Sequence, residues 1–69
     1  MKALVKYRTS QAHYVSCNSK SEVDYCLLQL KLRNISAEVI DLTKMNSNER
    51  AQYPKADFGF ERFKKKILL

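Results

Sequence analysis

The chain has 69 residues, enough for one small domain, and 45% of them are hydrophobic, which argues against disorder, collagen and low complexity. Thirteen Lys and Arg against seven Asp and Glu give a net charge of +6. No apolar run approaches the roughly 18 residues of a membrane span, and the N-terminus has no apolar stretch typical of a secretory signal. The sequence therefore predicts one basic domain over residues 1–69, cytoplasmic and without a membrane partner.

The first seventeen residues are typical of two short strands. Residues 3–8 (ALVKYR) show the alternation of a strand, and residues 12–17 (AHYVSC) read as a second one. The polar residues 9–11 between them favour a turn. We expect either a hairpin or one strand preceded by an extended arm.

A central helix is expected over residues 20–33. Ser19 and Glu22 have the spacing of a capping box, in which the hydroxyl accepts an amide hydrogen bond and the carboxylate reaches back. Asn34 tolerates the left-handed conformation that ends helices.

This helix carries two apolar stripes on nearly opposite sides. One consists of Val23, Cys26, Leu27 and Leu30, and the other of Tyr25, Leu28 and Leu32. A helix lying on one sheet needs a single stripe, so the second must meet another helix or another molecule. We therefore treat Tyr25, Leu28 and Leu32 as a candidate protein interface.

The remaining elements follow from similar signals. Residues 35–42 read as a strand, and Asn46 with Glu49 predicts a short helix over residues 47–52 that Pro54 stops. Asp57 is expected to cap a last helix, whose apolar side holds Phe60, Phe63 and Ile67. The predicted fold is α+β, in the order ββαβα, with two or three strands, a central helix and a C-terminal helix.

The last helix offers a cover for the second stripe. We expect Phe60, Phe63 and Ile67 to pack on Tyr25, Leu28 and Leu32 and so to close the core of a monomer, because small domains rarely expose that much apolar surface. The alternative is an open stripe that builds a symmetric homodimer or holds a partner.

No catalytic constellation is recognisable. Gly59 is the only glycine, which excludes a glycine-rich phosphate loop, and His13, the only histidine, is interpreted as an ordinary strand or turn residue. Cys17 and Cys26 are too few for a disulfide scaffold and are expected to be reduced, partly buried and redox-inactive. With His13 they match no common zinc spacing. The expectation is a non-enzymatic protein without cofactor or metal.

The charges are unevenly distributed. Residues 1–20 hold four cations and no acid, residues 21–42 hold four acids and two cations, and residues 43–69 hold seven cations and three acids. Two basic ends around a slightly acidic centre favour an anionic partner. Aromatic residues accompany these cations, as in sites that combine phosphate contacts with base stacking. The candidate residues for nucleic acid or another anionic partner are Lys2, Lys6, Arg8, Arg62, Lys64, Lys65 and Lys66.

Residues 14–42 resemble the opening strand–helix–strand unit of glutaredoxins. The clearest part is residues 33–42 (RNISAEVIDL), which is similar to the family's Lys-Gly-Ile-x-Tyr-Glu-x-Ile-Asp-Leu pattern, and residues 59–63 (GFERF) are similar to its Gly-Gly-Phe segment. The family's Cys-x-x-Cys falls on residues 20–23, with Cys17 three residues too early and Cys26 three too late. The resemblance implies a trimmed thioredoxin-like fold that has lost the redox motif and is kept for binding.

These observations lead to two hypotheses of function. The first is a small basic binding module that regulates or inhibits a nucleic-acid-associated protein, in the manner of a phage-type accessory protein, or that binds nucleic acid directly. The alternative is a degenerate glutaredoxin-like protein that acts by protein–protein interaction or residual thiol chemistry.

Overall fold

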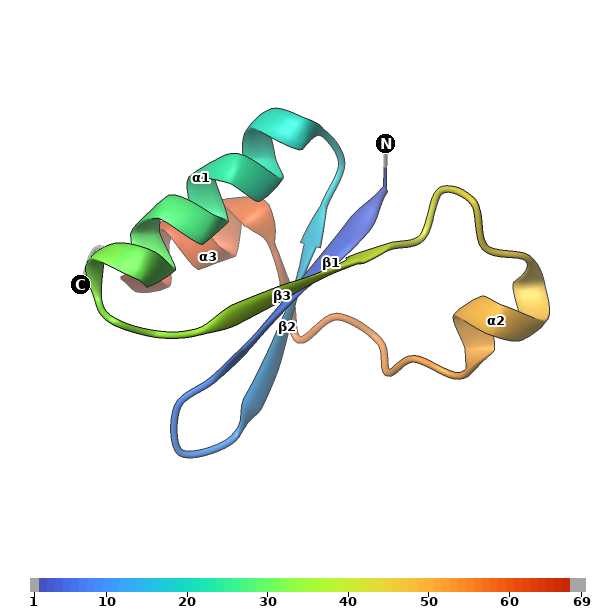
Figure 1. The fold of residues 1–69 in the computed structure, drawn as a ribbon, viewed down its shortest axis with the longest axis horizontal. Coiled ribbons are helices and arrows are strands. Elements are labelled where there is room, and N and C mark those ends of the chain that lie inside the picture. The colour runs from blue at the N-terminus through green and yellow to red at the C-terminus, as the bar shows by residue number, and fades with distance from the viewer. Residues whose placement is uncertain (1, 68–69) are drawn as a thin grey trace.

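The computed structural model describes residues 2–67 and shows an α+β domain with a four-stranded sheet (Figure 1). The sheet order is β3-β1-β2-β4, with β1 antiparallel to both β2 and β3, and β4 parallel to β2. The elements, in chain order, are β1 (Ala3–Arg8), β2 (Ala12–Cys17), α1 (Lys20–Leu32), β3 (Ala37–Asp41), α2 (Ser47–Ala51), β4 (Phe58–Gly59) and α3 (Phe60–Ile67). The predicted fold class is confirmed.

The two faces of the sheet are covered unequally. On the helix face, Ala3, Val5 and Tyr7 of β1 join Val15 and Cys17 of β2 in a core that α1 and α3 close. On the back face, Leu4 packs with Ile40 and Leu42 in a smaller cluster, to which Met45 and Ala56 of the segment around α2 contribute. Figure 1 shows α1 and α3 on one side of the strands and α2 on the other.

Local sequence signals account for most of the element boundaries. Of the two arrangements expected for residues 3–17, β1 and β2 form the hairpin, with Val5 opposite Val15. At the start of α1, Ser19 Oγ accepts the amide of Glu22 at 3.2 Å, and the Glu22 carboxylate accepts the amide of Asn18 at 2.9 Å. Asn34 follows the helix with a φ of 59°, the left-handed conformation that asparagine tolerates.

The predicted role of Asp57 is wrong. Its carboxylate accepts the amide of Tyr14 at 2.7 Å, and its own amide donates to the Tyr14 carbonyl at 2.8 Å. Asp57 therefore fixes the chain against β2, and the two-residue strand β4 lies between it and α3. Two residues are too few to show any periodicity, so this fourth strand has no signature of its own in the sequence.

The prediction that α3 closes the second stripe of α1 holds for one residue and is wrong for two. Phe60 packs edge-on against Tyr25, with ring centroids 5.4 Å apart. Leu28 and Leu32 remain 53% and 68% exposed. The reason is geometric, because α3 lies on the flank of α1 that carries Tyr25, whereas both leucines point away from the sheet and from α3.

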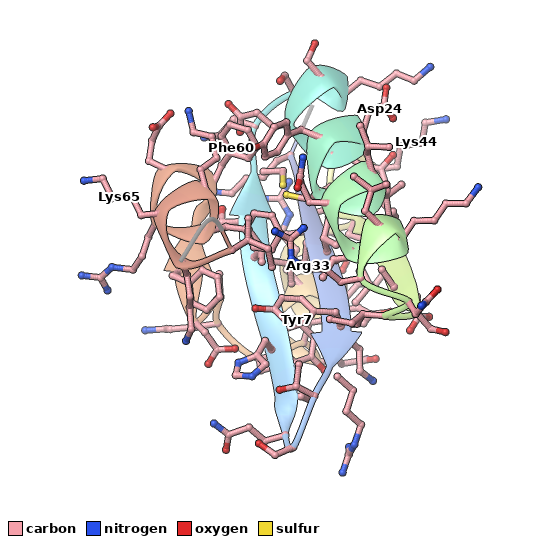
Figure 2. All side chains as sticks on the ribbon, turned by 90° about the vertical axis from the view of Figure 1, so that its left-hand side faces the viewer. Tyr7, Asp24, Arg33, Lys44, Phe60 and Lys65 are labelled. Carbon is pink, nitrogen blue, oxygen red and sulfur yellow. The ribbon has the colours of Figure 1, made fainter. Side chains whose placement is uncertain are left out.

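Arg33 fixes the two helices at their C-terminal ends. Its guanidinium donates to the Gln29 carbonyl and side chain at 3.0 and 2.9 Å and to the Ile67 carbonyl at 2.8 Å. Figure 2 shows Arg33 reaching between α1 and α3. The carbonyls at a helix C-terminus lack partners within the helix and carry partial negative charge, so a guanidinium is well suited to this position.

The two faces of α1 differ enough to be separated by one pair of substitutions. Leu30 is completely buried and Leu28 is exposed. We expect Leu30→Ala to lower the free energy of unfolding by about 2–5 kcal/mol, because it leaves a cavity under the helix. Leu28→Ala is the matched control and should stay within about 0.5 kcal/mol of wild type. Urea unfolding followed by circular dichroism measures both. Equal losses in the two variants would mean that the outer face is also packed.

Candidate anion-binding surfaces

Helix α3 presents its cations to solvent. Arg62, Lys65 and Lys66 are exposed, and we call these three residues the α3 basic face. Figure 2 shows Lys65 pointing outward from the helix. Lys64 differs, because its ammonium lies 3.1 Å from the Glu61 carboxylate and 5.0 Å from the Phe60 ring centroid. The structure thus separates Lys64, a predicted contact residue, from the other three.

The α3 basic face has a rigid support. Phe63 is completely buried under the helix, and its ring stacks on Phe58 with centroids 6.5 Å apart. The Lys66 ammonium lies over the same Phe58 ring, 5.0 Å from its centroid. An ammonium over an aromatic face is held by the ring quadrupole, so Lys66 has a preferred position beside β4.

The cations of the N-terminal strand lie elsewhere. Lys2, Lys6 and Arg8 alternate with the buried residues of the helix face, and successive side chains of a strand point to opposite sides. They therefore belong to the back face, where Lys6 lies over the Tyr14 ring at 5.9 Å from its centroid. The structure does not bring the predicted cations together. They form two groups on opposite sides of the sheet.

The back face also contains a hollow of about 300 Å³ that the sequence analysis missed. Lys2 lines it together with Arg50 and Lys55, which come from the segment around α2. These two cations were not among the predicted contact residues, since neither lies in a run of basic residues. Only the fold of residues 42–57 against the sheet places them beside Lys2.

His13 has a packing role. Its ring stacks on Tyr7 with centroids 5.0 Å apart, and its Nε2 lies 3.2 Å from the Thr9 hydroxyl across the hairpin turn. Within residues 2–67 no three His, Cys, Asp or Glu side chains gather as metal ligands would.

The two cysteines are closer than the sequence analysis expected. Cys17 on β2 and Cys26 on α1 have their sulfurs 3.7 Å apart, and both residues are completely buried. Each thiol therefore has a neighbouring thiol, and both are more deeply buried than the partial burial that the sequence predicted. The hydrogen bond with Cys17, together with burial, raises the pKa of the Cys26 thiol, which keeps it protonated and unreactive at neutral pH.

Comparison with protein-family models, with curated proteins and with solved structures found no match for the chain. None of the described helices is long and apolar enough to cross a membrane. The function is therefore inferred from the surfaces described above.

Burial of both sulfurs predicts slow thiol chemistry in the folded protein. We expect a water-soluble aromatic disulfide reagent to label Cys17 and Cys26 only as fast as the domain opens, and to label both at once in denaturant. Absorbance of the released thiolate measures the two rates. Rapid labelling of the native protein would show that the cysteine pair is accessible.

Proposed function

We propose that the protein is a non-enzymatic basic binding module that binds nucleic acid directly, by its backbone phosphates, through the α3 basic face. The observation that carries the proposal is the lack of internal neutralisation. Among residues 2–67 one salt bridge is present, Lys64 with Glu61, although the chain has thirteen Lys and Arg. Arg62, Lys65 and Lys66 are exposed and have no carboxylate partner within these residues, which leaves them to attract an external polyanion.

The geometry of α3 supports phosphate contacts rather than reading of base sequence. Arg62 and Lys66 are four residues apart and therefore share one side of the helix, with Lys65 beside them. Three cations within five residues, little more than one turn, suit successive phosphates of a strand. Arginine and lysine contacts of this kind fix a protein on a nucleic acid without carrying sequence information.

A second candidate function rests on the outer face of α1. Leu28 and Leu32 lie four residues apart on the same side of the helix, and both are more than half exposed. An apolar pair presented in this way is typical of a docking surface for another protein. The corresponding function is regulation or inhibition of a nucleic-acid-associated protein, or assembly of a homodimer.

Charge reversal on α3 tests the first function. We expect Arg62→Glu/Lys65→Glu/Lys66→Glu to remove most of the affinity for a fluorescent single-stranded oligonucleotide, because three phosphate contacts are replaced by repulsive charges. A single reversal at one of these positions should remove one phosphate contact. It should then reduce the slope of log K against log salt concentration by about 0.7. Fluorescence anisotropy at several salt concentrations gives both the affinity and this slope.

The matched control is Lys20→Glu/Lys31→Glu/Lys44→Glu, which changes the net charge by the same amount at exposed positions on α1 and after β3. It should retain most of the affinity. An equal loss in both triple variants would mean that net charge alone drives the association. Wild-type binding that ignores salt would contradict a phosphate contact.

A charged substitution on α1 tests the second function. Leu28→Arg should leave the thermal transition in place, because Leu28 is outside the core, but it should remove any association through this face. Light scattering reports a dimer, and capture from extract with and without nuclease reports a protein partner. Ser21→Arg adds the same charge to the same helix and should change neither result. A dimer or captured partner that survives Leu28→Arg would place the contact elsewhere.

A further inference from the structure

The hollow on the back face is walled by three cations from three parts of the chain. Lys2 precedes β1, Arg50 belongs to α2, and Lys55 follows α2, while none of the residues that line the hollow is acidic. Asp41, Glu49 and Asp57 each adjoin a lining residue in the chain; the Asp41 carboxylate accepts the Thr43 amide at 2.8 Å, and the Asp57 carboxylate accepts the Tyr14 amide at 2.7 Å. Like charges gathered around one hollow repel each other until an anion enters it, so the site favours a negatively charged ligand.

The Arg50 guanidinium and the backbone of Lys2 are held in place before any ligand binds. Arg50 donates from Nε and Nη2 to the Leu42 carbonyl at 3.1 and 2.9 Å. This leaves Nη1, which has no hydrogen bond within residues 2–67, to donate to a ligand. Lys2 is also anchored, since its amide donates to the Thr43 hydroxyl at 3.0 Å and its carbonyl accepts the Leu42 amide at 2.8 Å. A fixed guanidinium that keeps a free donor is well suited to a phosphate oxygen.

The same hollow has an aromatic wall. Tyr53 lines it and is 38% exposed, and Pro54 beside it restricts the backbone. The volume of about 300 Å³ is at the lower end of the range for small-molecule sites. Cations next to an accessible ring offer the two kinds of contact that a nucleotide makes. The phosphate contacts the cations, and the base stacks on the ring.

We propose that this hollow binds one nucleotide unit, with its phosphate at Lys2, Arg50 and Lys55 and its base on Tyr53. The site goes beyond the α3 basic face, because α2 and α3 lie on opposite sides of the sheet (Figure 1). The nucleotide is either a free mononucleotide or one residue of a single strand. The recognising chemistry is the same in both cases.

The test compares three probes: adenosine 5′-monophosphate, inorganic phosphate and a short single-stranded oligonucleotide. Amide chemical shifts of the ¹⁵N-labelled protein locate binding, and we expect saturable shifts at Ser16, Tyr53 and Lys55 with the mononucleotide. Inorganic phosphate alone should shift the same amide signals but with a weaker affinity. Tighter binding of the oligonucleotide at these amides identifies a strand as the source, and tighter binding of the mononucleotide identifies a free ligand.

Two variants divide the site into its parts. Tyr53→Leu should lower the affinity for the mononucleotide by about 5- to 150-fold, the range for loss of one base–aromatic stack. It should leave the affinity for inorganic phosphate unchanged. Lys2→Gln/Lys55→Gln should lower the affinities for the mononucleotide and for inorganic phosphate by about tenfold or more, since charge-assisted hydrogen bonds are lost. Lys20→Gln/Lys31→Gln, on α1, is the control and should change neither. These variants keep Arg50, so the contact with Leu42 that supports the fold is preserved.

Other outcomes overturn the proposal. No saturable shift with any probe, or shifts confined to α3, would exclude the hollow as a site. Mononucleotide and phosphate affinities that are equal, with no effect of Tyr53→Leu, would exclude a nucleotide. The triple charge reversal on α3 separates the two proposals, because it should remove most of the binding at α3 and leave the shifts at Tyr53 and Lys55 in place.

Discussion

Strand β1 determines the arrangement of the domain, because among residues 2–67 it alone is paired along both edges with strands of comparable length. Its odd-numbered residues are buried under the helices, and its even-numbered residues must then face the other way. Lys2, Lys6 and Arg8 are therefore directed away from α3 by the same alternation that builds the core. A register shift by one residue would bring the cations into the core and expose the apolar residues, which makes this arrangement strongly specified.

The sequence predicts well those features that depend on neighbouring residues. The hairpin, the cap at Ser19, the left-handed Asn34 and the inner stripe of α1 are all determined within a few positions, and each is present. The features it misses depend on contacts between distant segments. Asp57 bonds to Tyr14 across 43 residues. Cys17 and Cys26 each lie on an inner face, as their periodicity indicates, but only the crossing of α1 over β2 brings their sulfurs together.

The candidate sites show the same division. The cations of α3 are consecutive or nearly so, and a helical projection is enough to place Arg62, Lys65 and Lys66 on its outer side. The hollow behind the sheet has no such signature. Its cations come from positions 2, 50 and 55, and its geometry depends on the short helix α2 being held by the bond from Arg50 to Leu42. Isolated cations in a sequence are ordinarily solvated surface residues, so only the folded chain distinguishes these from the rest.

The separation of the two basic surfaces bears on how the two proposed sites would act together. The domain is 35 Å along its longest axis, and α3 and α2 lie toward opposite ends of that axis (Figure 1). A straight duplex touches one side of such a domain at a time, whereas a strand that reaches both must bend around the sheet. Sites this far apart, with no shared side chain, contribute free energies that add. The sheet between them therefore makes the proposed phosphate binding at α3 and the proposed nucleotide binding behind the sheet independent of each other.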